Sequence, residues 1–333
     1  MFPQKVEIIT TLFLFIWLAG LLILERKFPY RPGLPFFREG FWVDLVLYTL
    51  IQSYFLKIII FDYVIYPLGE RYHFSSLQLV SGWPVWTQVL FFLVTHDFYI
   101  YWFHRWQHRS PLLWRTHEAH HSGKHVDWLS GSRSHAVEIL INQTVEFAPI
   151  ILLGADPMVV PIKAMLDAVW GTYIHSNVNV KSGWLQYVIN GPEMHLWHHA
   201  DHQEVFHANF ATKFAFWDWL FGTAYLPGHK PERWGLYYDY PKDYFLQHAF
   251  SLKRFDERKL LANPVFRKYY YLRPNLLRLL SKPVARPGKA DGPRPSTTPA
   301  VETAASGLVS EATGRPESGE HPVTAAVRQP VRQ

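Results

Sequence analysis

Apolar residues gather in five long segments that are separated by polar connections. Residues 8–24 carry no charged side chain and approach the ~20 residues that a membrane-spanning helix needs. The sequence Gly-Ala-Asp-Pro at 154–157 separates the last two segments and predicts a tight turn between antiparallel helices. We therefore expect a bundle of transmembrane helices. Its predicted spans are residues 8–24, 41–67, 84–103, 136–154 and 158–174.

Two features of these segments bear on the prediction. The first segment has an alternative interpretation as a secretory signal peptide, but no small-residue cleavage site follows it and its flank is Glu25-Arg26-Lys27. The last two segments contain charged side chains. Because a charge in lipid is costly, we expect these side chains to face the bundle interior or a metal site. They are Glu138, Glu146, Lys163 and Asp167.

Basic residues in the connections predict an orientation. The 25–40 connection and the 104–134 stretch are rich in Arg and Lys, whereas 68–83 holds only Arg71. Cytoplasmic loops carry an excess of these residues, so both basic stretches are predicted to be cytoplasmic, with the N-terminus outside. We expect an integral, multi-pass membrane protein, in the cell membrane of a bacterium or the endoplasmic reticulum of a eukaryote.

The composition excludes several kinds of site. The 333 residues include no cysteine, which rules out disulfides, iron–sulfur clusters, thiolate-ligated haem and Cys-type zinc sites. A bound metal must therefore use His nitrogens or carboxylate oxygens. The formal net charge is +6, but the Lys and Arg residues flank apolar segments or lie in the tail. A membrane surface is thus the expected partner, and no nucleic acid is expected.

Nine histidines stand close to the apolar segments, eight of them in three tight clusters. On a helix, residues at i, i+3 and i+4 share one face, so each cluster presents its imidazoles to one side. Imidazole is the commonest neutral metal ligand. Since one metal takes four to six ligands, nine converging imidazoles predict two metal ions. The histidines are His104 and His108; His117, His120 and His121; His195, His198 and His199; and the single His175.

The remaining histidines do not share the close helical spacing of the three clusters. His96 lies beside Asp97, two helical turns before His104, and is interpreted as a group that supports the ligands. His125 and His202 each lie four residues past a clustered histidine, across stretches where a continuous helix is not required. No neighbour at ligand spacing accompanies the others, namely His73, His229, His248 and His321.

One cluster also fits a different chemistry. His117-Glu118-Ala119-His120-His121 satisfies His-Glu-x-x-His, the pattern of zinc metalloproteases with Glu as general base. The cluster at 195–199 has no Glu in that position, and a protease explains neither the repetition nor His104 and His108. An intramembrane zinc metalloprotease and a non-catalytic metal- or lipid-binding membrane protein stay as alternative hypotheses.

The motifs resemble those of the sterol desaturase and fatty acid hydroxylase superfamily, which are integral-membrane di-iron oxygenases. Residues 97–122 are similar to its first two histidine boxes with their spacer, and 195–199 is similar to its third box. The isolated histidine of its last membrane helix corresponds to the sequence His175-Ser-Asn177. The resemblance covers roughly residues 40–225.

Further motifs accompany these boxes. Arg133-Ser-His135-Ala-Val-Glu138 is similar to the family's Arg-x-His-Pro-x-Glu element, with Ala136 where Pro is usual. His207-Ala-Asn209-Phe210 and residues 217–223 are also family-like. His175 lacks a histidine partner four residues away, so a tenth nitrogen, if needed, must come from His96, His125, His135 or His202.

The resemblance implies an all-α fold and a function. The nine histidines would bind two iron ions, with zinc as a substitute in purified protein. The supporting residues would be His96, Asp97, His135, Glu138, Asn177 and Asn209. We expect hydroxylation or desaturation of a lipid C–H bond with O2. No cytochrome b5 segment, dinucleotide loop or ferredoxin-like cysteine set is visible, so a separate reductase is the expected electron donor.

Four parts of the chain are predicted. Residues 1–80 hold N-terminal membrane helices, and 81–230 form the histidine-box catalytic domain, with membrane helices and a cytoplasmic helical cap around the di-metal site. Residues 231–281 extend the cap. From 282 to 333 the chain is rich in Pro, Ala, Gly, Ser and Thr and poor in aromatics, so a disordered tail is expected.

Overall fold

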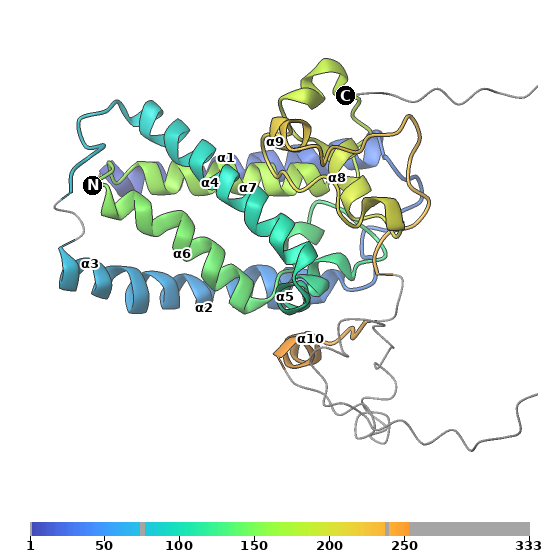
Figure 1. The fold of residues 1–333 in the computed structure, drawn as a ribbon, viewed down its shortest axis with the longest axis horizontal. Helices are drawn as coiled ribbons and strands as arrows, with labels where there is room; N and C mark the ends of the chain where they lie inside the picture. The colour runs from blue at the N-terminus through green and yellow to red at the C-terminus, as the bar shows by residue number, and fades with distance from the viewer. Residues whose placement is uncertain (1, 74–76, 237–239, 253–333) are drawn as a thin grey trace, which may run out of the picture. The chain divides into compact units, whose positions relative to one another are not determined.

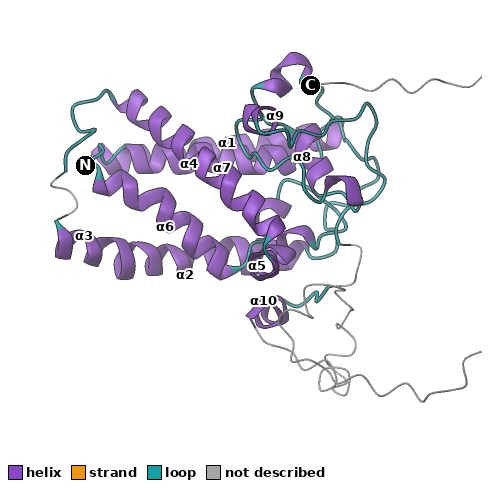
Figure 2. Cartoon of the chain, in the orientation of Figure 1, coloured by secondary structure: helices purple, strands orange, loops and turns teal. Residues whose placement is uncertain are grey.

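The computed structural model of the protein describes residues 2–73, 77–236 and 240–252, and its regular structure is helical (Figures 1 and 2). Within these ranges no strand occurs, and extended pairing is limited to two isolated bridges, Pro29–Val178 and Ala200–Trp234. The expected all-α class is confirmed. The predicted tail at 282–333, and the part of 231–281 beyond residue 252, lie outside the described residues.

Helices occupy all five predicted apolar segments. Two of them, Gln4–Lys27 and Val43–Tyr72, are long and apolar enough to cross a membrane. A topology with five spans stays a prediction, as does the side of the membrane on which each end lies. The helices are α1 (Phe2–Lys27), the continuous run η1 (Val43–Gln52), α2 (Ser53–Ile58), η2 (Ile59–Ile65) and α3 (Tyr66–Tyr72), then α4 (Val85–Arg109), α6 (Ala136–Leu152) and α7 (Val159–His175).

Shorter helices connect and follow the long ones. Figure 1 shows α5, α8 and α9 beside the same ends of α4 and α7. α5 packs on α4, α6 and α10, while α8 packs on α7. These elements are α5 (Pro111–His121), η4 (Ser130–Ser132), η5 (Gly183–Tyr187), α8 (Pro192–His198), η6 (Gln203–Val205), α9 (Phe216–Leu220) and α10 (Tyr244–Leu252).

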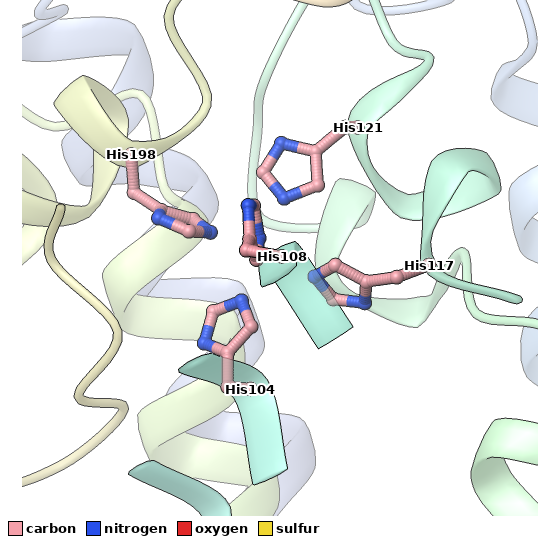
Figure 3. Close-up of side chains that lie close together, drawn as sticks. All are labelled: His104, His108, His117, His121 and His198. Carbon is pink, nitrogen blue, oxygen red and sulfur yellow. The ribbon is translucent and has the colours of Figure 1, made fainter. Parts of the chain in front are cut away.

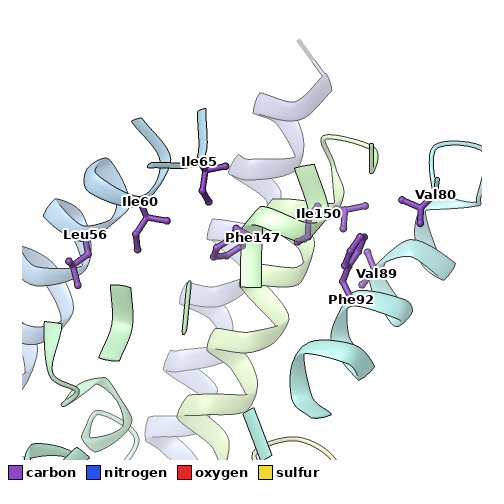
Figure 4. Packing of buried hydrophobic residues seen from close by; sticks show 9 residues of the cluster. Leu56, Ile60, Ile65, Val80, Val89, Phe92, Phe147 and Ile150 are labelled. Carbon is purple, nitrogen blue, oxygen red and sulfur yellow. The ribbon is translucent and has the colours of Figure 1, made fainter. Parts of the chain in front are cut away.

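Apolar packing holds the long helices together away from the histidines. α7 contacts α1, α4 and α6, and the 43–72 run contacts α6. A buried apolar cluster joins the 43–72 run to α4, α6 and the start of α7 (Figure 4). By contrast, α1 exposes large apolar side chains such as Phe15 and Ile16, at 66% and 72%. Such a surface is costly in water and suits a lipid environment.

A buried network of two arginines and two aspartates ties the start of the 43–72 run to the loop before α6. Asp44 is fully buried and accepts from Arg133 Nε at 2.7 Å, while Arg38 Nη1 lies 2.8 Å from its other oxygen. Arg38 also bridges to Asp127 at 2.7 Å. The network fixes Arg133, whose backbone carbonyl accepts from His120.

The first prediction concerns this network. Asp44→Ala leaves two buried guanidinium groups without a shared carboxylate, so we expect it to lower the free energy of unfolding by about 3–5 kcal/mol. Thermal unfolding in detergent measures the change. Glu7→Gln breaks the exposed Lys57–Glu7 pair, with side chains 68% and 63% exposed, and serves as the control with little expected effect. Equal unfolding midpoints for the two variants would contradict the prediction.

Candidate metal centre

The structure brings all nine predicted histidines together at one end of α4 and α7. His104 and His108 lie in the last two turns of α4, and His175 is the last residue of α7. α5 contributes three imidazoles from its final turns, and α8 contributes three more, the last from the residue that caps it. The spacing i, i+3, i+4 thus places each cluster on one helix face, as expected.

The nine imidazoles divide into two groups, and within each group the candidate ligand atoms lie within 4.8 Å of one another. Figure 3 shows the rings of the larger group around a common space. The five-histidine group contains His104, His108, His117, His121 and His198, and the four-histidine group contains His120, His175, His195 and His199.

Hydrogen bonds fix the tautomers in the five-histidine group. A backbone carbonyl can only accept, so an imidazole nitrogen beside it must carry the hydrogen. Three Nδ1 atoms donate to carbonyls of one loop, which leaves each Nε2 with a free lone pair. The pairs are His104 with Phe210 at 2.8 Å, His108 with Phe206 at 3.0 Å, and His198 with Ala208 at 2.7 Å.

The Nε2 atoms of this group are buried and have no hydrogen-bond partner among the residues that the structure describes. A buried polar atom without a partner is unfavourable and calls for an explanation. Several lone pairs that face one small space have no protein donor to share, whereas a metal cation satisfies all of them. The arrangement therefore fits a metal ion held by up to five imidazoles.

The four-histidine group shows close contacts between ring nitrogens. His175 Nε2 lies 2.9 Å from His195 Nε2 and 3.2 Å from His120 Nε2. Because the Nδ1 atoms of His120 and His175 donate to carbonyls, their Nε2 atoms both carry lone pairs and cannot bond to each other. Two ligands at right angles on a metal with bonds of about 2.1 Å lie about 3.0 Å apart. The spacing fits ligands of a second ion.

Burial also keeps these imidazoles in the form that binds metal. Desolvation lowers the pKa of all nine, to about 4 for His104 and His175. Neighbouring imidazoles add to the effect in most of them, since a charge on one disfavours a charge on the next. The rings are therefore neutral near pH 7, as metal ligands must be.

Glu138 contacts a ligand directly. His117 Nδ1 lies 3.0 Å from Glu138 Oε1, with both side chains buried, at 5% and 6% exposure. A carboxylate that accepts from Nδ1 fixes the ring and leaves Nε2 for the metal. The sequence predicted that Glu138 supports the metal ligands, and the structure shows that the histidine it contacts is His117.

Two other expected supporting residues anchor the loop that carries the three acceptor carbonyls. Asp97 is fully buried and accepts from the backbone N–H groups of Lys213 and Phe214 at 2.9 and 3.0 Å. Asn209 adopts a left-handed conformation, with φ 57°, and its Nδ2 donates to Met194 O at 2.9 Å. The loop is thereby tied both to α4 and to α8.

The last three expected supporting residues form no hydrogen bond with either histidine group within the described part of the chain. Asn177 bonds the backbone of Arg31 and so anchors the chain after α7. His135 caps the N-terminus of α6, where its Nδ1 accepts from Val137 N at 3.1 Å, and it stacks on His248. His96 lies in a separate, partly buried cluster with Glu146 and Asp167. Neither His96, His125, His135 nor His202 supplies a tenth nitrogen to the two groups.

A cavity of about 220 Å³ adjoins both groups. Five of the nine histidines line it, together with residues of α4, α6 and α7 and with Thr212 and Lys213 of the loop before α9. The inward placement of the charged residues in the last two apolar segments agrees with expectation: Lys163 is fully buried and Glu146 lines the cavity. Sequence reasoning missed Lys213, because it stands in a loop without a charge pattern.

The fold and the site define a helical, membrane-type protein with a histidine-rich centre suited to two metal ions. Residues 89–223 match the fatty acid hydroxylase family. With its three histidine motifs, this part of the chain is similar to the sterol desaturase and fatty acid hydroxylase superfamily. The resemblance noted in the sequence is therefore confirmed.

Named relatives are lipid-modifying enzymes. The chain is 32% identical over 215 residues to ornithine lipid hydroxylase OlsE of Rhizobium tropici, covering 63% of this chain and 65% of that protein. It is 27% identical over 226 residues to human alkylglycerol monooxygenase, covering 66% and 48%. The chain thus spans less than two thirds of either relative. It is 29% identical over 226 residues to a rice very-long-chain aldehyde decarbonylase, GL1-8 of Oryza sativa subsp. indica, covering 62% and 80%. No solved structure matches.

The second prediction concerns metal content. We expect about two metal ions per chain in the wild type, since two groups of four to six ligands are present. His108→Ala and His199→Ala remove one ligand from different groups, and each should reduce the content toward one ion. Elemental analysis by mass spectrometry after desalting measures this, with the exposed His229→Ala as control. At most one ion in the wild type would refute the two-site arrangement.

The third prediction concerns the Glu138–His117 contact. Glu138→Ala leaves Nδ1 of His117 without its acceptor, so metal affinity should fall about 10–100-fold. Glu138→Gln keeps an oxygen that can accept and should retain most of the affinity. Competition with a chelator measures both variants, and an unchanged affinity in Glu138→Ala would show that the contact does not orient the ligand.

Proposed function

We propose that this chain is a membrane-bound di-iron oxygenase that uses O2 and external electrons to hydroxylate or desaturate a C–H bond of a lipid. The observation that carries the proposal is the pair of histidine groups, whose neutral rings turn lone pairs toward two adjacent spaces. The match of residues 89–223 to the fatty acid hydroxylase family supports the same reaction class. Iron is the proposed metal, with zinc able to replace it in purified protein because Fe2+ binds more weakly.

The protein residues have defined tasks in this reaction. The nine histidines hold the ions, and iron when bound supplies the O2 chemistry. Glu138 orients His117, while the carbonyls of residues 206–210 orient three further rings. The cavity beside both groups would hold the reacting carbon and limit access of water.

The overall reaction balances as follows. In hydroxylation a C–H bond breaks and a C–O bond forms, while the second oxygen atom of O2 leaves as water with two protons and two electrons. In desaturation two hydrogens leave the substrate and both oxygen atoms leave as water, again with two external electrons and two protons. A separate reductase system would supply the electrons.

The substrate class is proposed from the relatives and from the exposed apolar helices. Two relatives are named as a hydroxylase of ornithine lipids and a monooxygenase of alkylglycerols, both lipids. Exposed apolar side chains on α1 and on the 43–72 run fit a protein embedded in a membrane that contains its substrate. We propose five spans with the metal centre on the cytoplasmic side, as the basic connections predict.

The metalloprotease hypothesis fits the geometry less well. A catalytic zinc site keeps three protein ligands and an open position. His117 and His121 lie in a group of five imidazoles, and His120 between them belongs to the other group. A non-catalytic metal- or lipid-binding role differs from the proposal in one measurable way, since only an oxygenase consumes O2 when lipid and electrons are present.

The fourth prediction tests the activity. Membranes of an expressing strain, supplied with a reductase system and ¹⁸O2, should yield a lipid that gains one labelled oxygen or loses two hydrogens, detected by mass spectrometry. His120→Ala and His198→Ala each remove one ligand from a different group and should lower turnover more than about 100-fold, beyond the effect of losing an outer partner. His229→Ala is the matched control. Full activity in both ligand variants would refute the assignment.

A further inference from the structure

The cavity beside the histidine groups has a polar, charged end within the bundle. Lys163, fully buried on α7, donates to Glu146 Oε1 and Asp167 Oδ2, each at 2.7 Å. Lys213 Nζ lies 2.7 Å from the other oxygen of Asp167. Ionisable groups at such a depth are costly and typically mark a functional site. The proposed reaction, as described so far, does not use them.

His96 belongs to this charged end, and its tautomer follows from its neighbour. Its Nδ1 lies 3.2 Å from Lys163 Nζ. An ammonium group donates hydrogen bonds and cannot accept them, so Nδ1 accepts and the ring hydrogen is on Nε2. His96 therefore presents an N–H group from its Nε2.

That N–H group has no partner within the described part of the chain. The Nε2 atom is buried without a hydrogen bond there, and the His96 side chain, 9% exposed, lines the cavity. Glu146 Oε2 lies 3.9 Å away, too far for a direct bond. A donor and an acceptor thus border the same cavity, separated by a distance that one small bridging group can span.

A hydroxyl group is the chemical match for this pair. A hydroxyl both donates and accepts, whereas an ammonium only donates and an ether oxygen only accepts. We propose, building on the oxygenase function above, that the cavity selects lipids that carry a free hydroxyl. The hydroxyl accepts from His96 Nε2 and donates to Glu146 Oε2, and thereby places the substrate relative to the histidine groups.

The surroundings of the pair favour a bound ligand group over a purely structural role. Lys163 hydrogen-bonds to both His96 and Glu146 and thereby holds them in place. The neighbouring ion pair of Lys213 and Asp167 balances the charge of this cluster. The same cavity is bordered by His104, His117 and His175, so a lipid anchored at the charged end extends toward both metal groups. A site built to hydrogen-bond a hydroxyl rejects an analogue that lacks one.

Binding can be tested without turnover. The full chain, loaded with redox-inert zinc in lipid nanodiscs, is titrated with 1-O-hexadecylglycerol and with its di-O-methyl ether, which differ in the hydroxyl hydrogens. A second pair, cholesterol and its 3-O-methyl ether, distinguishes a sterol hydroxyl from a glycerol hydroxyl. We expect the wild type to bind the free alcohol of one pair at least about tenfold more tightly than its ether, the effect of one hydrogen bond.

Variants then test the His96 contact. His96→Phe keeps a ring but removes the N–H group, from which the alcohol and the ether can both accept, and should weaken binding of the free alcohol about tenfold. His96→Gln restores an N–H donor and should keep most of the affinity, while His229→Phe, an exposed position, should equal the wild type. If His96→Phe does not load metal, the proposal is tested by the alcohol and ether affinities of the wild type and of His96→Gln.

Two results would overturn the proposal. One is equal affinity of the wild type for alcohol and ether in both pairs, and the other is undiminished affinity for the free alcohol in a metal-loaded His96→Phe protein. Neither result depends on oxygen chemistry. Failure of ¹⁸O incorporation would refute the oxygenase function while leaving the hydroxyl preference intact, so the two failures are distinguishable.

Discussion

The centre depends on the direction in which each imidazole donates its hydrogen. An Nδ1–H group bonded to a fixed acceptor leaves the Nε2 lone pair pointing inward, and this holds for His104, His108, His117 and His198 in one group and for His120 and His175 in the other. The acceptors must therefore be rigid. Asn209 holds the loop at 206–210, Asp97 fixes the chain just beyond it at Lys213, and the buried Asp44 network holds the carbonyl of Arg133. The buried polar side chains named here thus help to orient the imidazole rings.

The fold separates two tasks between its two ends. Apolar residues from the 43–72 run, α4, α6 and α7 pack together away from the histidines and need no polar partners. At the other end, backbone carbonyls, carboxylates and imidazoles are buried together and must satisfy one another or a metal. Since buried polar groups are costly, the apolar packing supplies the stability that such a centre requires.

Periodicity and spacing in the sequence were sufficient to predict the five long helices, the turn near 154–157 and the nine converging histidines. Local patterns carry such information, because a helix face and a turn are set by neighbours in sequence. The division into groups of five and four was not predictable, because it depends on how α5 and α8 approach α4 and α7. The partners of the rings were hidden for another reason: most are backbone carbonyls, which every residue has. Asp97 and Asn209 were recognised from a family pattern, but their partners emerged only from the three-dimensional arrangement.

Adjacent residues in two places belong to different histidine groups. His120 and His121 on α5, and His198 and His199 at the end of α8, are each split between the two sets. Consecutive Cα atoms are held about 3.8 Å apart by the peptide bond. The peptide bonds at these two points therefore limit the distance between the two histidine groups. A rotation of α5 therefore moves candidate ligands of both groups together and cannot adjust one group alone.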